Sequence, residues 1–507
     1  MGILTDESLE FAKEHIQKYY ASDFFPKAFE FEALWYNWAD VKNELMSKNV
    51  SRHTVYSPKT LASFKPKGTF RVVHQLEPID AIIYTALAFQ VADKVEAARI
   101  PIDEHVACSY RIELKDGSFF GSGNGFTFFT SKSEELANQY TYVLVTDITD
   151  FYNQIYLHRL NNAIEYADPN LKVVADDIES VLSRINSKAS QGVPVGPAAS
   201  IVMSEAILID VDKFLIGKDV RHTRYVDDFR IFSDSEEHLW AVLEELTLYL
   251  YKTHRLTLAT EKTKITESSK YVEEILHNHY ELEKVEIFQT LEVFNPYTEE
   301  NEKVEEAFDD KGEKAEAQLE VIAGKVLERS VLDLGLARSL VRKAKAYKSV
   351  TLVDVLFGNF TFFAPIINDV CLYLNAITDD VFAESIKDKI IGVLGLPIAR
   401  SGLVKEWIGW YISQHVVFLA NDDIKRYVMN GESVAHQATA AIATNDLAWI
   451  RGKRDDLYSV GNWERRALLH AAQILPSDEK THWLRLTING APSSIDRWVA
   501  KWVLEEL

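Results

Sequence analysis

Alternating apolar and polar positions mark two short strands near the middle of the chain. The runs extend from Val220 to Tyr225 and from Phe229 to Ser233, and they flank Val226-Asp227-Asp228. Period-two alternation on both sides of a short connection is typical of a β-hairpin. The pattern therefore predicts a hairpin whose tip carries two adjacent carboxylates, which fits either a solvated turn or a metal site.

A third carboxylate follows another predicted strand. The apolar run Tyr142 to Thr146 predicts a buried strand that ends at Asp147, and an aromatic residue, Tyr152, comes five positions later. Residues 190–197 contain two glycines and two prolines, which predict a rigid loop, and Ala198 to Ile209 has helix-like composition. The order along the chain is thus an acid at a strand end, a Gly/Pro loop that enters a helix, and an acidic hairpin.

These motifs, in this order and spacing, resemble the palm of reverse transcriptases over roughly residues 50 to 270. Lys67 to Arg71 is similar to the fingers segment that holds the incoming triphosphate. Leu256 to Lys264 is similar to the segment in which a lysine approaches the leaving pyrophosphate. The resemblance implies an α+β fold with reverse-transcriptase-like fingers and palm, and an enzyme that is a nucleotidyltransferase acting on dNTPs.

The resemblance also implies a two-metal site at the three aspartates. Asp147 and Asp227 would bridge two Mg²⁺ ions, and Asp228 would complete the cluster. The Ile148 carbonyl would bind the ion on the triphosphate side. Phosphoryl transfer to a 3′-oxygen uses two divalent ions about 4 Å apart, and hard oxygen ligands suit Mg²⁺ or Mn²⁺. Clustered carboxylates without metal would raise one another's pKa.

Three expected nucleotide contacts lie in the palm segments. By the resemblance, Tyr152 would pack against the sugar 2′-position, exclude a ribose hydroxyl and so select deoxynucleotides. Gln191 and Gly192 would line the same site, where only glycine lets the backbone approach base and sugar closely. A plain aromatic side chain packed beneath the sheet stays an alternative for Tyr152.

Three cations are the other expected nucleotide contacts. Arg71 and Lys67 would bind phosphate, the arginine through its planar fork and the lysine as a point charge. Lys262 would approach the pyrophosphate. Ordinary surface charges are the alternative for Lys67 and Arg71, and a solvated strand edge that includes Lys264 is the alternative for Lys262.

Helical periodicity replaces the short strands after about residue 290. The predicted helices are Ser330–Ala346, Asp379–Leu394, Leu403–Leu419, Ser433–Ile450, Asn462–Leu475 and Ile495–Leu504. Gly and Pro between them are typical of stacked antiparallel helices. The sequence therefore predicts a polymerase domain over 1–295 and an α-helical domain over 296–507. Without a strict repeat, an α-solenoid rests on the alternating helices alone.

Composition limits what the polymerase half binds. The chain has 55 Lys and Arg against 76 Asp and Glu, a formal net charge of −21. Residues 1–300 hold 30 of the basic and 47 of the acidic residues, so the predicted polymerase half carries most of the negative charge. A protein that grips a long duplex neutralises several phosphates with Lys and Arg. The composition therefore argues against extended duplex binding.

The cysteines and the apolar stretches bear on location. Cys108 and Cys371 are the only cysteines, which excludes a disulfide framework and a cysteine-rich zinc site. No apolar stretch is expected to reach the length of a membrane span, and Met1 to Gln17 has the pattern of an acidic amphipathic segment instead of a secretion signal. These features predict a cytoplasmic protein with no membrane contact.

Looser motifs resemble a narrower group, the abortive-infection (Abi) polymerases of bacteria and prophages. The segments are Ser22 to Pro26 and Trp463 to Leu469, together with the helical carboxy-terminal half. The resemblance implies untemplated DNA synthesis primed on a tyrosine of the protein, single-stranded product attached covalently, and a homo-oligomer that stops phage growth. It also implies a HEAT-like helical domain and no recognisable thumb. No motif singles out one of the 22 tyrosines as the primer.

Two other functions stay open. One is a template-dependent RNA-directed DNA polymerase of retron or group II type, against which the negative charge and the absence of a basic carboxy-terminal element count. The other is a helical scaffold on a vestigial palm. The intact set of Asp147, Asp227 and Asp228, with Tyr152 and Gln191, argues against decay of the site.

Overall fold

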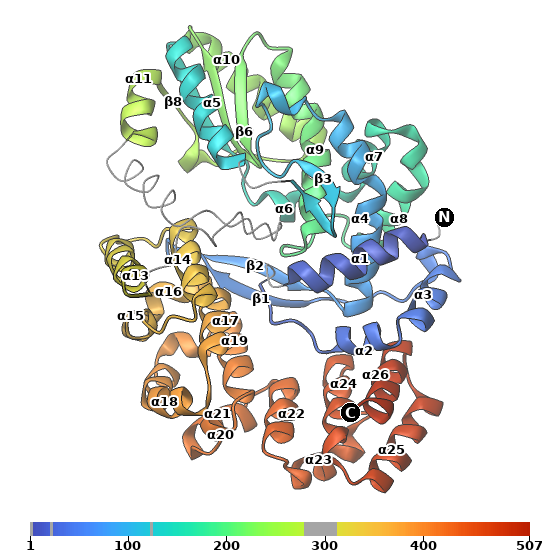
Figure 1. The fold of residues 1–507 in the computed structure, drawn as a ribbon. Helices are drawn as coiled ribbons and strands as arrows, with labels where there is room; N and C mark the ends of the chain where they lie inside the picture. Colours follow the sequence, from blue (N-terminus) through green and yellow to red (C-terminus); the bar gives the residue numbers. More distant parts are fainter. Residues whose placement is uncertain (1–3, 21–23, 122–124, 278–311) are drawn as a thin grey trace. The chain divides into compact units, whose positions relative to one another are not determined.

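The computed structural model describes residues 4–20, 24–121, 125–277 and 312–507. The chain separates into two compact units (Figure 1). The first comprises Met1–Asp23, Lys42–Lys59 and His74–Lys303, and the second comprises Phe24–Val41, Thr60–Val73 and Val304–Leu507. The predicted boundary at residues 295 and 296 lies outside the described residues, so it stays a prediction. Two segments near the amino terminus group with the carboxy-terminal helices, which no sequence pattern indicated.

A four-stranded antiparallel sheet forms the centre of the first unit. Its order is β6-β7-β5-β8, from Arg221–Tyr225, Asp228–Ser233, Tyr142–Asp147 and Lys264–Glu267. The predicted hairpin is β6 and β7, and the predicted strand that ends at Asp147 is β5. Both predictions are therefore confirmed, because two-residue alternation identified the strands from local sequence alone.

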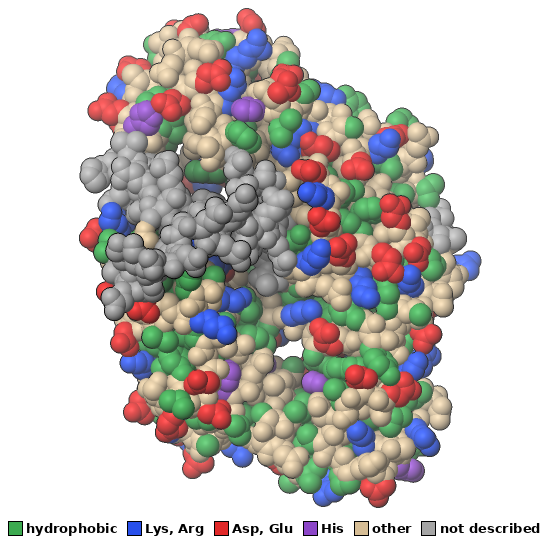
Figure 2. Space-filling model, viewed as in Figure 1, with side chains coloured by type: hydrophobic (Ala, Val, Ile, Leu, Met, Phe, Trp, Pro, Cys, Tyr) green, Lys and Arg blue, Asp and Glu red, His purple; other side chains and the backbone are tan. Residues whose placement is uncertain are grey.

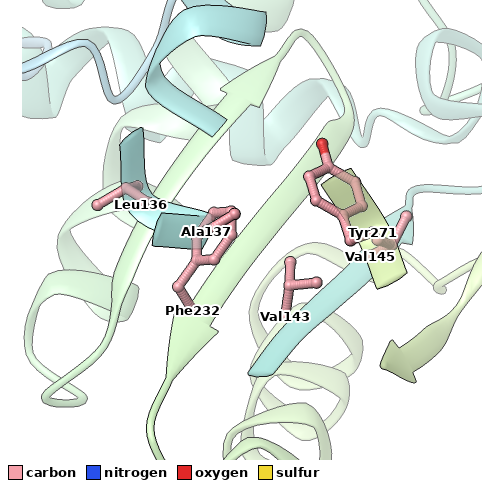
Figure 3. Close-up of a cluster of buried hydrophobic side chains, with 6 residues drawn as sticks. All are labelled: Leu136, Ala137, Val143, Val145, Phe232 and Tyr271. Atoms are coloured by element: carbon pink, nitrogen blue, oxygen red, sulfur yellow. The ribbon is translucent and has the colours of Figure 1, made fainter. Parts of the chain in front are cut away.

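One face of this sheet is covered by a compact hydrophobic cluster (Figure 3). It is built from α5 (Gly125–Gln139), α11 (Ser268–Tyr271) and the two central strands. Its members are Leu136, Ala137, Val143, Val145, Phe232 and Tyr271. Side chains alternate between the faces of a strand, so Asp147 and Asp228 point to the same side as this cluster. Leu144 and Ile231 point to the opposite side and are fully buried.

Helices enclose the rest of the first unit. Those with their residues wholly in it are α1 (Asp6–Tyr19), α4 (Pro78–Ala98), α6 (Phe151–Gln154), α7 (Leu157–Ala167), α8 (Lys172–Ile185), α9 (Ala198–Ile216) and α10 (Glu236–Tyr249), and a small hairpin comprises β3 (Ile112–Lys115) and β4 (Ser118–Phe120). α9 is apolar on nearly every side and packs against α4 and α7. It continues well past Ile209, where composition had ended it.

The described carboxy-terminal residues from Gly312 onward contain helices and no strand. These are α13 (Gly312–Leu327), α14 (Leu334–Ala346), α15 (Val353–Gly358), α16 (Phe360–Phe363), α17 (Ile367–Ile377), α18 (Asp380–Leu394), α19 (Gly402–Ser413), α20 (Val416–Leu419), α21 (Asp422–Met429), α22 (Val434–Ala443), α23 (Leu447–Lys453), α24 (Asn462–Ala471), α25 (Ser477–Gly490) and α26 (Ser494–Glu505). The largely helical carboxy-terminal region is thus confirmed, and a HEAT-like arrangement stays a prediction.

Two predicted helices are each broken in two. Leu403–Leu419 is divided into α19 and α20, and Ser433–Ile450 is divided into α22 and α23. At the second break Asn445 has a φ of 51°, and the Asp446 side chain accepts a hydrogen bond from the Trp449 amide as the cap of α23. The apolar periodicity continues across the break, so only the capping residues could have indicated it.

Segment 24–41 packs with the carboxy-terminal helices of the second unit. It carries α2 (Glu30–Tyr36), and the Glu30 carboxylate accepts a hydrogen bond from Arg466 of α24 at 2.8 Å. The indole of Trp407 on α19 donates to the Phe24 carbonyl at 2.6 Å. Trp407 is 2% exposed, in agreement with a core role for tryptophan in this half. The hairpin of β1 (Lys59–Phe64) and β2 (Phe70–Gln75) and the helix α3 (Trp38–Met46) have residues in both units.

One described run, Phe360–Ile377, has the length and mean hydropathy of a membrane span. The expectation that no apolar stretch reaches this length was therefore wrong for this run. It comprises α16, a 3-10 turn and α17, and 61% of it is buried. That burial is typical of a core helix of the second unit.

Candidate active site

The strand register brings the three predicted aspartates to one end of the sheet. Asp147 on β5 and Asp228 on β7 are directly opposite partners, and Asp227 precedes Asp228 in the hairpin turn. The Ile148 amide donates to the Asp227 carbonyl at 3.1 Å, and the Ala259 amide donates to the Asp147 carbonyl at 2.8 Å. The backbone on both sides of Asp147 is therefore fixed by neighbouring segments.

Asp147 forms an ion pair with Lys262. The Lys262 Nζ lies 2.8 Å from Asp147 Oδ2. Burial raises the pKa of the Asp147 carboxyl, and the hydrogen bond from Lys262 offsets part of this rise. The Lys262 side chain is 58% exposed, so it can leave Asp147 at little cost. In this structure Lys262 therefore contacts Asp147, a predicted metal ligand. The sequence analysis had expected Lys262 to approach the pyrophosphate.

Asp228 is paired with Arg230, which sequence analysis had not singled out. Arg230 Nη1 lies 2.5 Å from Asp228 Oδ1 and Nη2 lies 3.1 Å from Oδ2, so the pair is bidentate. Arg230 also lies over the Phe129 ring and donates to the Tyr271 hydroxyl at 3.1 Å. Its side chain is only 10% exposed. The signal was present in the sequence, because positions 228 and 230 share one face of a strand.

Asp227 differs from its neighbours because no described cation pairs with it at hydrogen-bonding distance. Burial raises the pKa of the Asp227 carboxyl to about 7, and the nearby Asp147 charge adds to the rise. A divalent cation between Asp147 and Asp227 would relieve both effects. On this observation the residues fit the Mg²⁺ or Mn²⁺ that the resemblance implies.

The fit depends mainly on Asp147 and Asp227. Within the described ranges, no group of three or more His, Cys, Asp and Glu side chains is arranged as a metal site. In the structure, Asp147 is paired with Lys262 and Asp228 is paired with Arg230. The exposed Lys262 can be displaced by a metal ion, whereas the buried Arg230 stays beside Asp228. The roles of Asp228 and of the Ile148 carbonyl as ligands stay predictions.

The Gly/Pro loop is bonded to the short helix α6 that follows Asp147. The Val193 amide donates to the Tyr152 carbonyl at 2.9 Å, and the Gly192 amide donates to the Ile155 carbonyl at 2.8 Å. Gln191 donates through its side chain to Gln154 at 2.6 Å. These bonds bring Tyr152, Gln191 and Gly192 together, as the predicted nucleotide site requires.

Asn186 supports this loop and was missed by sequence analysis. Its side-chain amide donates to the Gln191 carbonyl at 2.9 Å and to the Gly192 carbonyl at 2.7 Å. Gly192 has a φ of 94°, a conformation that favours glycine. A lone asparagine ahead of a Gly/Pro loop carries no distinctive pattern, so only the folded loop identifies it.

Lys67 and Arg71 lie on the hairpin of β1 and β2. Lys67 is in the turn, where the Lys65 amide donates to the Thr69 carbonyl at 2.8 Å, and Arg71 is on β2. Both side chains are exposed. They belong to segment 60–73, which groups with the second unit. Their contact with phosphate therefore stays a prediction.

A family model described as reverse transcriptase (RNA-dependent DNA polymerase) matches residues 64–286. The chain contains a reverse transcriptase domain. It is accordingly an enzyme of the nucleotidyltransferase class, similar to RNA-directed DNA polymerases. Every predicted site residue, from Lys67 to Lys262, lies within the reverse transcriptase domain. No curated protein matches the chain.

Solved structures similar to the chain include telomerases from two Candida species. Apo telomerase from Candida tropicalis has a TM-score of 0.35 at 14% identity, over 75% of this chain and 73% of that one. Telomerase from Candida albicans in complex with a fragment of telomeric RNA has a TM-score of 0.32 at 13% identity, over 74% and 70%.

A Candida tropicalis telomerase truncated from its C-terminal domain has a TM-score of 0.31 at 16% identity, over 42% of this chain and 49% of that one. The present chain thus spans about half the length of that enzyme.

Proposed function

We propose that the reverse transcriptase domain adds deoxynucleotides to a growing DNA strand, with Asp147 and Asp227 as the principal metal ligands. The observation that carries this proposal is the strand register that sets the Asp147 carboxylate beside the turn of Asp227. Two bound Mg²⁺ ions would supply activation of the attacking oxygen and neutralise charge on the triphosphate. The two carboxylates hold that site, and burial limits competing water.

Lys262 and Tyr152 have distinct roles in this proposal. With metal bound at Asp147, Lys262 would be free to direct its ammonium toward the leaving pyrophosphate, which its exposed side chain would permit. Tyr152 lies on α6, directly after β5, and packs against the sugar 2′-position so that a ribose hydroxyl is excluded. Gln191 and Gly192, bonded to residues 154 and 155, line the same nucleotide site.

We further propose that synthesis needs no template and starts on a tyrosine of the chain, as in abortive-infection polymerases. The net charge of −21 supports this, because a strand covalently linked to the protein needs no electrostatic capture of duplex. On the face shown in Figure 2, Lys and Arg side chains are interspersed with Asp and Glu. A tyrosine hydroxyl would take the place of the 3′-oxygen in the first addition. A homo-oligomer that arrests phage growth completes the proposal.

A template-dependent RNA-directed DNA polymerase of retron or group II type is the alternative. The description of the matching family favours it. The two functions differ in how nucleic acid is held. Capture of a duplex through several phosphates would weaken steeply as salt rises, whereas a covalently attached strand would stay bound.

Purified protein incubated with Mg²⁺ and labelled dNTPs, without template or primer, tests the proposal. Asp227→Asn is the inactive variant, and Asp219→Asn is a matched control. Asp219 is exposed and has a φ of 56°, which asparagine also tolerates. Products are separated on denaturing gels with and without protease treatment.

Label that migrates with the wild-type and Asp219→Asn polypeptides, is released by protease and is absent from Asp227→Asn would support self-primed synthesis. Label that appears only with added template and primer would overturn untemplated synthesis and support the template-dependent alternative. Equal labelling of Asp227→Asn and wild type would overturn the assignment of the catalytic aspartates.

A further inference from the structure

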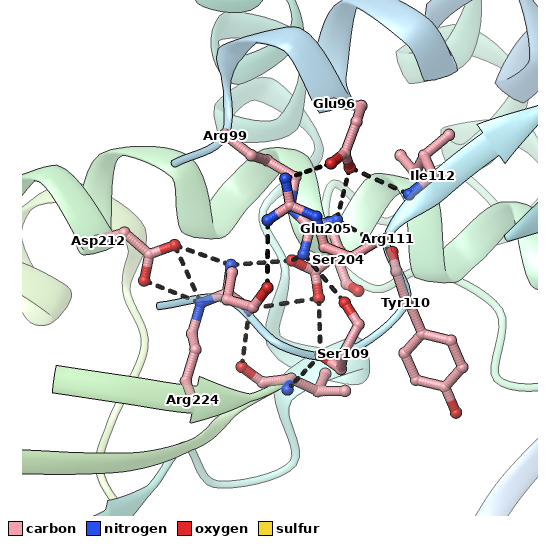
Figure 4. A network of polar contacts seen from close by, with 12 residues as sticks. Glu96, Arg99, Ser109, Tyr110, Arg111, Ile112, Ser204, Glu205, Asp212 and Arg224 are labelled. Carbon is pink, nitrogen blue, oxygen red and sulfur yellow. Dashed lines mark hydrogen bonds and ion pairs between the residues drawn. The ribbon is translucent and has the colours of Figure 1, made fainter. Parts of the chain in front are cut away.

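A network of charged side chains (Figure 4) contacts Val226, the residue before Asp227. Arg224 on β6 is fully buried between two carboxylates of α9, and it contacts Asp212 at 2.9 Å and Glu205 at 2.8 Å. Arg99 reaches Glu205 at 2.9 Å from the end of α4. Three arginines and three carboxylates balance in charge: Arg99, Arg111, Arg224, Glu96, Glu205 and Asp212.

The balance explains why Arg99, Arg224, Glu205 and Asp212 can be buried. An isolated buried ion is costly, whereas a paired and hydrogen-bonded one is tolerated. Although burial would raise the pKa of Asp212, the Arg224 charge holds that pKa well below its ordinary value. Burial likewise opposes the charge on Arg224, but Asp212 and Glu205 raise its pKa. The pairs therefore stay ionised and fix the geometry of the network.

The network bonds directly to the peptide groups of Val226. Arg224 Nη1 donates to the Val226 carbonyl at 3.1 Å, and the Val226 amide donates to Ser109 Oγ at 2.7 Å. The Ser109 hydroxyl is oriented in turn by Glu205 at 3.4 Å, and its carbonyl accepts from Arg99 at 3.0 Å. Both the donor and the acceptor of Val226 are thus held by buried groups.

Val226 needs such restraint because its backbone is strained. Its φ is 55°, in the left-handed region that β-branched residues rarely adopt. Strained conformations of this kind persist where the surrounding structure over-determines them, and they cluster at functional sites. This conformation directs the chain so that Asp227 follows at the end of the sheet, next to the Asp147 strand.

We propose that Ser109 and Arg224 are positioning residues, which hold the Val226 peptide in its left-handed conformation and thereby hold Asp227 against Asp147. Glu205 joins this restraint to α9, which begins directly after the Gly/Pro loop of the nucleotide site. The inference rests on the proposed role of Asp227 as a metal ligand.

Mn²⁺ binding and steady-state kinetics of the full chain test this inference. The lead variant is Ser109→Ala, which removes one hydroxyl, and Arg224→Lys is the second. Ser204→Ala is the matched control, because Ser204 is equally buried on α9 and, among the described residues, its hydroxyl donates to the Ile201 carbonyl of its own helix, at 2.8 Å. Asp227→Asn reports on the site itself. Mn²⁺ affinity is measured by titration, together with the melting temperature, kcat and KM for dNTP.

We expect Ser109→Ala to weaken Mn²⁺ binding about 10-fold and to lower kcat about 10- to 100-fold, as loss of groups that orient metal ligands does. KM for dNTP should stay within about twofold, because the nucleotide contacts are intact. Ser204→Ala should lower the melting temperature about as much as Ser109→Ala does, because each variant loses one buried hydroxyl. It should leave Mn²⁺ affinity and kcat within about twofold of wild type.

Two results would overturn the inference, and they differ in reach. If Ser109→Ala and Ser204→Ala bind Mn²⁺ equally well while Asp227→Asn does not bind it, the network is only structural and the proposed function stands. If Asp227→Asn binds Mn²⁺ like wild type, both the ligand assignment and the positioning role fail. Arg224→Lys is interpreted only if its melting temperature shows that it is folded.

Discussion

At the scale of single residues, three neighbouring aspartates differ in what surrounds them. Asp147 is paired with the exposed Lys262, Asp228 is paired with the buried Arg230, and Asp227 is left to interact with Asp147. The three carboxylates therefore differ in how easily each can turn toward a metal ion. Asp147 and Asp227 can turn to a metal ion, whereas Asp228 would have to break two hydrogen bonds with an arginine that cannot withdraw.

We therefore expect Asp228→Asn to be milder than Asp227→Asn. Loss of a principal ligand should lower the rate of nucleotide addition by on the order of 10³-fold or more, and loss of Asp228 by on the order of 10- to 100-fold. Single-turnover incorporation of a labelled dNTP measures both. Equal losses would mean that Asp228 binds metal directly and that Arg230 releases it. Asp219→Asn serves as the control in the same assay.

The raised pKa of Asp227 predicts how stability depends on pH. The folded value of about 7 lies above the value of about 3.9 for an unfolded aspartate, so the folded state binds the extra proton. Without metal, stability should fall as pH rises from about 4 to about 7. Asp227→Asn removes this pH-dependent loss of stability. Without metal, the melting temperature of the variant should therefore exceed that of wild type at pH 8 but not at pH 4.

Addition of Mg²⁺ supplies the complementary measurement. At pH 8 Mg²⁺ should raise the melting temperature of wild type and leave that of Asp227→Asn nearly unchanged. Only wild type has an ionised carboxylate at position 227 that can bind the ion. At pH 6 the rise for wild type should be smaller, since the proton competes with the metal. A Mg²⁺ effect of the same size at both pH values would contradict the raised pKa.

At the scale of elements, the loop of residues 190–197 depends on a residue outside any motif. Asn186 holds two carbonyls of this loop, while Gly192 supplies the left-handed backbone. Motif residues were predictable because glycine and proline act on their own backbone. Asn186 could not be predicted in this way, because its role depends on a turn that brings its side chain to the loop.

Asn186→Ala should loosen the loop and leave the aspartates in place. We expect KM for dNTP to rise about 3- to 10-fold, with kcat within about threefold, because two hydrogen bonds that support the loop are lost while the aspartates keep their own contacts. Asn153→Ala is a control on α6, since the Asn153 side chain donates to Asp150 and not to the loop. A fall in kcat alone would place Asn186 in the chemistry instead.

At the scale of the whole molecule, segment 24–41 belongs to the second unit although it precedes the palm in sequence. The ion pair of Glu30 with Arg466 fixes it there, and both side chains are almost fully buried. Arg466 also lies 4.8 Å from the centre of the Trp463 ring.

Arg466→Met should destabilise the second unit by about 3–5 kcal/mol, because it leaves the Glu30 carboxylate buried without its partner. The double variant with Glu30→Gln should recover part of the loss, since no unpaired charge then remains. Chemical denaturation followed by tryptophan fluorescence measures the transition. Arg426→Met, which breaks the exposed pair with Asp423, should cost less than about 1 kcal/mol. A cost equal to that control would show that the buried pair is dispensable.

The sequence by itself determined β5 with the acid at its end, the acidic hairpin of β6 and β7, and the helical character after Gly312. Each depends on spacing between residues near in the chain, and backbone geometry translates that spacing directly into a strand face or a helix face. Only the tertiary structure decided which charges are paired. Glu205 pairs with Arg224, which is 19 residues away in the sequence, and Ser109 bonds to Val226, which is 117 residues away. Glu30 pairs with Arg466, which is 436 residues away. A buried charge must find its partner wherever folding brings one, and local periodicity carries no record of that choice.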